Sequence, residues 1–284
     1  MKTNIFLLTA IVAVLLTSCK SVSYYQVYKA VPTDKLTNTG NRLVYEDDNC
    51  KVSYNFWGQG GNIGFSFYNK TDRNIYLNLD ESFFILNGIA HNYYKNRVFT
   101  DSKSSGTTSS LAASISKSVT GINFWTSLPT SKRVEATSSV GSVASSGYSV
   151  SYNEEKIICI PSKTLKIIAE YNINESLYRD CDLLLYPYAT KRQTQAKEFS
   201  RTESPFVFSN RIAYAVGQSG YLIRFENEFY ISEISNYPEK MLIVSTYDVF
   251  CKQKNWFKTE YFKDVSPDKF YIKYTKLKKD DRTH

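Results

Sequence analysis

Residues 50–57 read Cys-Lys-Val-Ser-Tyr-Asn-Phe-Trp, residues 58–62 read Gly-Gln-Gly-Gly-Asn, and residues 63–68 read Ile-Gly-Phe-Ser-Phe-Tyr. Polar and apolar side chains alternate in the first and third of these stretches. A period of two places successive side chains on opposite faces of a strand, and glycine tolerates the backbone angles of a tight turn. The pattern therefore predicts a β-hairpin whose turn lies at 58–62.

The same alternation continues along the chain. Residues 69–74, Asn-Lys-Thr-Asp-Arg-Asn, are typical of a turn, and strands are expected at 75–79 and 83–86 before the type I′ turn signal Asn87-Gly88. Further strands are expected at 157–160, 165–168, 182–186, 205–208, 211–216, 221–225, 229–231, 241–244 and 270–274. Many short strands at regular spacing predict a mostly β protein, an antiparallel β-sandwich.

Composition agrees with a folded β protein. The chain has 284 residues, of which 42% are hydrophobic and 22% charged, and this balance argues against intrinsic disorder. Aromatic residues make up 15%, and aromatic side chains favour strands. The stretch from Gly64 to Gly88 resembles immunoglobulin-like sandwiches of bacterial exported proteins. That resemblance implies an immunoglobulin-like sandwich domain over residues 41–284.

Residues 101–155 interrupt the strand pattern. This segment is rich in serine and threonine, whose side chains offer the backbone local hydrogen bonds that compete with β-ladders. We expect a long flexible insertion here, with no regular strands, whose flanking strands end close together. Leu111, Ile115 and Val119 recur at helical spacing, and an apolar cluster around Trp125 follows. The cluster either folds back on the sandwich or docks on a partner or a membrane interface.

The start of the chain is typical of an exported protein. Residues 5–16 are almost wholly apolar, a run too short to span a bilayer as a helix but suited to a secretion signal. The following Leu16-Thr17-Ser18-Cys19 resembles the lipobox of bacterial lipoproteins. The resemblance implies a signal peptide at 1–18, cleavage before Cys19, acylation of that cysteine, and a lipidated tether at 19–40. The lipid bilayer would then be a partner through the acyl chains of Cys19.

Residues after Cys19 bear on location. Lys20 follows the cysteine where an aspartate would imply retention in the inner membrane, and the first acidic residue is Asp34. By the sorting patterns of lipoproteins, this implies the outer membrane and a periplasmic orientation. With the Tyr-rich run at 24–28, the 69–72 turn and Ile160-Pro161-Ser162-Lys163, the chain resembles β-rich bacterial lipoproteins of the Bacteroidetes type, a family that implies no particular activity.

Cysteine spacing leaves the redox state open. Apart from Cys19 there are four cysteines, and none forms a Cys-x-x-Cys motif of the kind found in zinc ribbons or thioredoxin-like proteins. Four cysteines allow three disulfide pairings, and buried free thiols are an equal alternative. The four are Cys50, Cys159, Cys181 and Cys251.

Catalytic motifs are incomplete. Residues 58–64 depart from Gly-x-Gly-x-x-Gly at Ile63, and residues 217–221 depart from Gly-x-Ser-x-Gly at Tyr221. Both lie between expected strands rather than at the start of a helix, so both are predicted to be hairpin turns. A serine triad would have to join Ser219 to His91, because the other histidine, His284, ends the chain. We therefore expect no enzyme activity, no cofactor and no metal.

Two functions remain open at this point. The first is a membrane-anchored envelope lipoprotein with a non-catalytic binding or scaffolding role. The alternative is a glycan-binding or glycan-hydrolysing envelope protein, in which Trp57, Trp125 and Trp256 would be stacking platforms for sugar rings. The net charge of +8, with a basic cluster at the end of the chain, suits nucleic acid by itself, but export argues against that partner.

Overall fold

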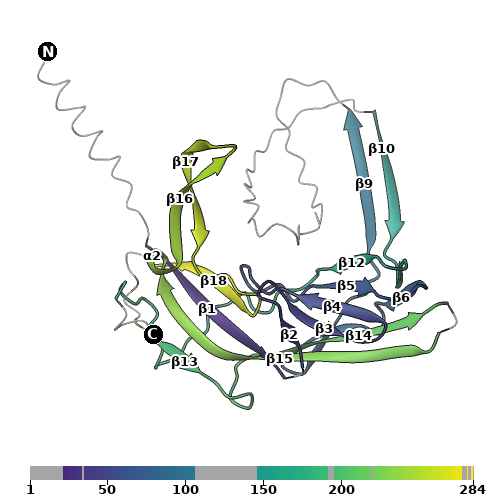
Figure 1. Cartoon of the computed structure of the whole chain (residues 1–284), viewed down its shortest axis with the longest axis horizontal. Coiled ribbons are helices and arrows are strands. Elements are labelled where there is room, and N and C mark those ends of the chain that lie inside the picture. The colour runs from purple at the N-terminus through teal and green to yellow at the C-terminus, as the bar shows by residue number, and fades with distance from the viewer. Residues whose placement is uncertain are drawn as a thin grey trace, which may run out of the picture.

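Two antiparallel sheets pack face to face in the computed structural model, and two hairpins project from them (Figure 1). The structure describes residues 22–33, 35–105, 146–190, 195–218 and 220–276, together with 280 and 283. The expected mostly β, antiparallel sandwich is confirmed. The immunoglobulin-like detail stays a prediction.

The larger sheet has nine strands, with β11, β6, β14, β15, β1 and β18 in that order, β13 beside β15, and the β7–β8 hairpin beside β14. Its strands are β1 (Ser23–Pro32), β6 (Ile75–Asn78), β7 (Phe83–Leu86), β8 (Ile89–Asn92), β11 (Ile157–Ile160), β13 (Ala196–Glu198), β14 (Val207–Val216), β15 (Leu222–Pro238) and β18 (Lys269–Thr275).

The smaller sheet has five strands in the order β12, β5, β4, β3 and β2. Its strands are β2 (Thr37–Asn38), β3 (Leu43–Glu46), β4 (Cys50–Tyr54), β5 (Phe65–Asn69) and β12 (Leu165–Ile168). One projecting hairpin consists of β9 (Val98–Ser105) and β10 (Ser146–Asn153), and the other of β16 (Ile243–Phe250) and β17 (Gln253–Phe262). A single turn of helix, α2 (Glu239–Leu242), joins β15 to β16.

Aromatic side chains fill the space between the sheets. Tyr54 of the smaller sheet packs against Phe229 of the larger one and against its own neighbour Phe65, and all three are fully buried. The hydroxyl of Tyr54 donates to Oδ1 of Asn227 at 2.8 Å, so this polar atom is satisfied inside the core. The alternation of residues 50–57 and 63–68 thus places its apolar set against the opposite sheet.

Asn69 holds together two places where the chain crosses between the sheets. The 69–74 turn carries the chain from β5 to β6, and the turn around Pro161 carries it from β11 to β12. Asn69 is fully buried, and its Nδ2 donates to the carbonyl oxygens of Arg73, Ile160 and Pro161 at 2.7, 3.0 and 3.1 Å. Its Oδ1 accepts from the amide of Thr71 at 2.9 Å.

The expected turns occur where glycine and asparagine predicted them. Asn87 and Gly88 both have positive φ, 47° and 82°, between β7 and β8. The 217–221 segment joins β14 to β15, with Gly217 at φ 76°. The 58–62 segment lies between β4 and β5, and both it and 217–221 are hairpin connections, as predicted.

Several expected boundaries differ from the structure. β1 lies inside the stretch 19–40 that was expected to be a tether, and it belongs to the large sheet because β15 and β18 pair with it on its two edges. Residues 182–186 form no strand, since Asp180 accepts from the amide of Asp182 at 2.9 Å and turns the chain there. Met241 and Leu242 lie in α2, so the strand expected at 241–244 begins only at Ile243.

The insertion expected at 101–155 differs at both of its ends. β9 and β10 continue into it and pair in register from Val98 opposite Asn153 to Ser105 opposite Ser146. The flanking strands therefore do end close together, but the prediction that regular strands stop at 100 and resume at 156 is wrong. Residues 106–145, including Trp125, lie outside the described part of the chain, as does Cys19.

Candidate functional site

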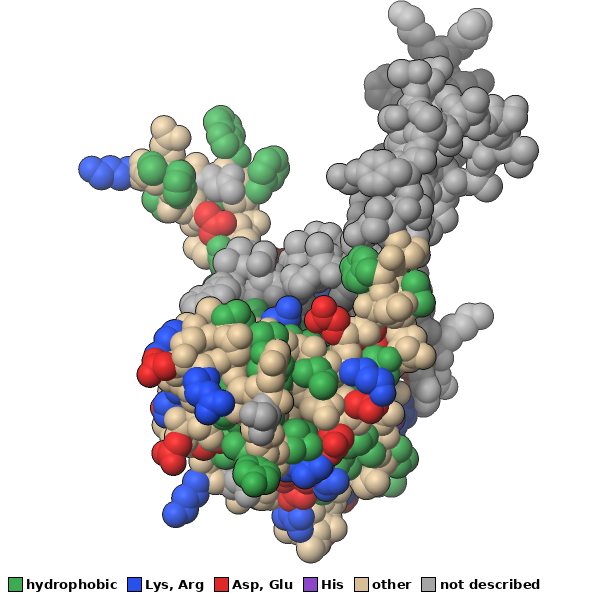
Figure 2. Space-filling view, turned by 90° about the vertical axis from the view of Figure 1, so that its right-hand side faces the viewer, with side chains coloured by type: hydrophobic (Ala, Val, Ile, Leu, Met, Phe, Trp, Pro, Cys, Tyr) green, Lys and Arg blue, Asp and Glu red, His purple; other side chains and the backbone are tan. Residues whose placement is uncertain are grey.

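The β16–β17 hairpin carries a cluster of exposed apolar side chains. Phe250, Trp256 and Phe257 near its tip are 82%, 92% and 79% exposed. Figure 2 shows hydrophobic side chains gathered on this hairpin where it stands away from the sandwich. We call the exposed set the hairpin patch, and its members are Val244, Tyr247, Val249, Phe250, Trp256, Phe257 and Tyr261.

A bulge directs the aromatic side chains of the tip outward. Tyr247 pairs with Lys258 and Val249 pairs with Lys254, so Asp248 alone opposes the residues from 255 to 257. Extra residues on one strand of an antiparallel pair bend that strand and re-aim its side chains. Trp256 and Phe257 belong to this bulged stretch, which explains why two neighbours along a strand are both exposed.

Lysines surround the patch near the tip. Between Val249 and Lys258 the chain holds Lys252, Lys254 and Lys258 and no carboxylate. The ammonium groups of Lys254 and Lys258 lie 4.1 and 5.5 Å from the ring centre of Tyr247, within the range of cation–π attraction. This end of the hairpin therefore combines aromatic rings with positive charge.

The nearest carboxylate is held within the hairpin. Asp248 accepts a hydrogen bond from Oγ1 of Thr259 at 2.6 Å and another from the hydroxyl of Tyr261. These two hydrogen bonds lower the pKa of Asp248, so it is ionised at neutral pH.

An aromatic cluster fixes the root of the hairpin to the large sheet. Phe262, the last residue of β17, lies 4.9 Å from Trp57, 5.4 Å from Tyr25 and 4.7 Å from Tyr271 between ring centres. Beside it, Nζ of Lys273 lies 3.1 Å from Oε1 of Glu239. These contacts join the hairpin to β1 and β18.

The root of the hairpin lies beside the beginning of β1. Tyr24 pairs with Pro238, the last residue of β15, and Ser23 pairs with Thr275 of β18. The hydroxyl of Tyr25 donates to Oε1 of Glu239 in α2 at 3.4 Å. Figure 1 shows the start of β1, α2 and the hairpin at one end of the molecule. β1 therefore begins next to the root of the hairpin that carries the patch.

Trp57 and Trp256, the two proposed sugar platforms that the structure describes, do not form one surface. Trp57 is half-buried and meets Phe262 edge to face, with 86° between the ring planes. Trp256 lies six residues before Phe262 on β17, which places it about 20 Å from the root along the strand. Trp57 thus supports the hairpin, whereas Trp256 is at its exposed end.

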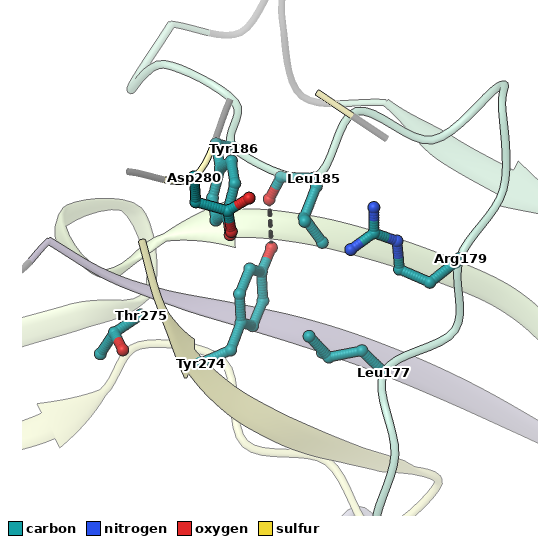
Figure 3. A pocket seen from close by; sticks show the side chains of 7 residues that line it. All are labelled: Leu177, Arg179, Leu185, Tyr186, Tyr274, Thr275 and Asp280. Carbon is teal, nitrogen blue, oxygen red and sulfur yellow. Dashed lines mark hydrogen bonds between the residues drawn. The ribbon is translucent and has the colours of Figure 1, made fainter. Parts of the chain in front are cut away.

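A pocket near the end of the chain offers little chemistry (Figure 3). It has a volume of about 430 Å³ and is lined by Leu177, Arg179, Leu185, Tyr186, Tyr274, Thr275 and Asp280. The hydroxyl of Tyr274 donates to the carbonyl oxygen of Leu185, and Tyr186 is hydrogen-bonded to Asp280. The hydroxyls of Tyr186 and Tyr274 and the carboxylate of Asp280 are therefore bonded within the fold.

His91 lies on β8 in a second pocket and packs against aromatic rings. Its ring centre is 5.7 Å from that of Phe84, with 26° between the planes, and 5.7 Å from that of Tyr171. The side chains around this pocket include Asp80 and Lys95, but no serine or cysteine among the described residues lines it. Ser219, which a triad with His91 would need, is outside the described residues.

Two glutamates meet an arginine at the base of the β9–β10 hairpin. Arg97 donates from Nε to Glu154 at 3.1 Å and from Nη1 to Glu170 at 2.7 Å. Burial raises the pKa of Glu154, but hydrogen bonds from the side chain and backbone of Arg97 outweigh that effect and hold the pKa below its usual range. A glycosidase acid needs a raised pKa, so Glu154 is unsuited to that role.

The four cysteines that the structure describes are free thiols. Cys50 is buried, and burial raises the pKa of its thiol, whereas Cys159, Cys181 and Cys251 are exposed. Among the described residues, no three His, Cys, Asp or Glu side chains gather in a group that could hold a metal ion. Within that same part of the chain, no helix is both long and apolar enough to cross a membrane.

Sequence reasoning missed the hairpin patch, apart from Trp256. The turn between β16 and β17 consists of Cys251 and Lys252, with φ 49° and 65°, where glycine or asparagine is usual. The sequence signal that predicts this hairpin is the run of β-branched and aromatic residues on both sides of the turn.

No protein-family model, no curated protein and no solved structure matches the chain.

Proposed function

We propose that the chain is a lipid-anchored envelope lipoprotein, held at the outer membrane through acylated Cys19 and facing the periplasm, with a non-catalytic binding or scaffolding role. The lipobox-like Leu16-Thr17-Ser18-Cys19 supports the anchor. Several acyl chains on one cysteine suffice for stable attachment, because each buried methylene contributes about 0.8 kcal/mol.

The position of β1 is the observation that carries this proposal. Ser23, the first residue of β1, follows Cys19 by four positions, and β1 lies between β15 and β18 in the large sheet. Four residues span at most about 14 Å. A lipid on Cys19 would therefore hold the sandwich directly against the bilayer, which suits a protein that presents surfaces at the membrane.

A non-catalytic role agrees with the bonding of the reactive side chains. His91 packs between aromatic rings, and Glu154 and Glu170 are bonded to Arg97. These groups are committed to the fold, whereas the exposed apolar side chains lie on the projecting β16–β17 hairpin. Surfaces of that kind mark interaction sites.

Replacing Cys19 tests the anchor. Cells expressing wild-type protein, Cys19→Ala or Cys181→Ala are labelled with a palmitate analogue and separated into membrane fractions. We expect label and outer-membrane recovery for wild type and Cys181→Ala, and neither for Cys19→Ala, which should keep its signal peptide. Labelling of Cys19→Ala at the wild-type level would contradict the proposal.

A protease experiment tests the orientation. We expect external protease to leave the protein intact in whole cells and to degrade it once the outer membrane is permeabilised. Degradation in whole cells would place the sandwich on the cell surface instead.

A further inference from the structure

We propose that the β16–β17 hairpin docks on an anionic lipid bilayer, with the hairpin patch at the interface between headgroups and acyl chains. The proposal rests on the proposed function only for the identity of the membrane. The hairpin would be a second attachment beside Cys19, and it would set the orientation of the sandwich on the membrane.

The composition of the hairpin tip suits a membrane interface. Tryptophan and tyrosine concentrate at the level of lipid headgroups, because their rings are apolar and their edges polar. Trp256 is 92% exposed and Phe250 is 82% exposed, yet neither packs against another part of the described fold. Burying these rings among lipid chains would remove their apolar surface from water.

The charge of the tip favours an anionic bilayer over an apolar protein surface. Lys252, Lys254 and Lys258 are exposed and border the aromatic side chains. Each lysine near an anionic membrane surface contributes about 1 kcal/mol. The carboxylate of Asp248 is hydrogen-bonded to Thr259 and Tyr261 within the hairpin, and its single negative charge is outweighed by the three lysines near the tip.

The geometry lets both attachments reach one bilayer. β16 has eight residues and is about 26 Å long, whereas the segment from Ser23 to Cys19 spans at most about 14 Å. A hairpin that docks on the same bilayer as Cys19 is therefore inclined to the bilayer normal, because it is longer than that reach. One face of the hairpin suits this inclination, because Val244 and Tyr261, which pair opposite each other on that face, are 43% and 38% exposed.

The aromatic cluster at the root of the hairpin fixes the direction of the hairpin relative to the sandwich. Phe262 packs on Tyr25 of β1 and Tyr271 of β18, so the direction of the hairpin is coupled to the large sheet. A docked hairpin would thus fix how the sandwich faces the membrane, rather than acting as a loose second anchor.

Quenching by brominated lipids tests the docking. The full chain is reconstituted in vesicles of phosphatidylglycerol and phosphatidylcholine, with and without bromine on the acyl chains. Subtracting the emission of Trp256→Phe from that of wild type isolates Trp256, because Trp57 and Trp125 remain in both. We expect the isolated emission to be blue-shifted and to be mostly lost with brominated lipid. Replacing Lys252, Lys254 and Lys258 by glutamine should restore most of it.

A matched control places tryptophan at the other end of β15. Tyr221 is 95% exposed and lies in the β14–β15 connection, 17 positions before Pro238 at the hairpin root. Tyr221→Trp in the Trp256→Phe chain should stay accessible to acrylamide and insensitive to bromine. Equal, weak lipid quenching at both positions would overturn the proposal.

Two other results separate this proposal from its alternatives. Loss of self-association on Trp256→Ala, together with no quenching of Trp256 by brominated lipid in the wild-type chain, would assign the patch to a second copy of the chain and overturn membrane docking. Failure of lipidation would appear as missing palmitate label on Cys19 while the quenching of Trp256 persists. Failure of docking would appear as palmitate label on Cys19 without quenching of Trp256 by brominated lipid.

Discussion

At the scale of single residues, buried side chains with several hydrogen bonds decide how the two sheets are joined. Asn69 is the main example, because its amide satisfies carbonyl oxygens on two separate crossings of the chain. A buried acceptor that loses its donor costs about 1–3 kcal/mol. The turn chemistry of residues 69–74 was visible in the sequence, but the bonds to Ile160 and Pro161 were not.

Replacing Asn69 by alanine should destabilise the fold strongly. We expect a loss of about 3 kcal/mol in the free energy of unfolding, because the buried carbonyl group of Ile160 and the partly buried carbonyl group of Pro161 both lose their donor. Urea denaturation followed by circular dichroism measures it. Asn38→Ala is the control, since Asn38 is exposed and accepts one local bond from Gly40, and it should cost about 1 kcal/mol or less. Equal losses would show that the crossings do not depend on Asn69.

The ion pair of Arg97 and Glu154 should make a contribution to the free energy of unfolding that depends on pH. The pKa of Glu154 is lowered in the folded state, so its contribution is present above the unfolded pKa of about 4.3 and is lost as the pH falls through the folded value. We expect Arg97→Met to cost about 2 kcal/mol at neutral pH and progressively less in acid. Urea denaturation at several pH values measures the difference.

The matched control for that experiment is Arg211→Met. Arg211 pairs with Glu226 on the surface, where the two side chains are 49% and 34% exposed. Such a pair contributes about 0.5 kcal/mol. A cost for Arg97→Met that stays constant between neutral and acidic pH would show that the ionisation of Glu154 is not involved.

At the scale of elements, the sequence predicted hairpins well where glycine or asparagine marks the turn. Alternation with a period of two assigns side chains to faces, but it does not say which strand is the neighbour. The β4–β5 and β7–β8 hairpins therefore followed from local signals. The β16–β17 hairpin did not, because Cys251 and Lys252 adopt angles that those residue types rarely take.

Shortening the β9–β10 hairpin should leave the sandwich folded. Ser105 lies directly opposite Ser146, so Asn-Gly in place of residues 106–145 would close a two-residue turn. We expect a Tm within about 4 °C of the full chain, which corresponds to about 1 kcal/mol at this size. Calorimetry measures it, with circular dichroism to follow the strands. A lost transition would show that residues 106–145 belong to the core.

At the scale of the whole molecule, the sandwich was predictable and its boundaries were not. Abundant aromatic residues and short alternating strands require two sheets that bury each other's faces, as Tyr54, Phe65 and Phe229 do. The place of β1 depends on long-range pairing with β15 and β18, which no local pattern encodes. The hairpin patch depends on the pairing of β16 with β17 on the two sides of Cys251, which the sequence alone did not predict.

The middle position of β1 has a mechanical consequence. A pull on Cys19 would act along the axis of β1, and antiparallel hydrogen bonds lie perpendicular to that axis. β1 is bonded along both edges, from Tyr24 to Pro32 on one side and from Ser23 to Lys29 on the other. Such a force shears many bonds at once instead of peeling them one by one. Under the proposed anchoring at Cys19, the strand that follows the anchor would thus be the one best placed to resist being drawn out of the protein when the envelope is under tension.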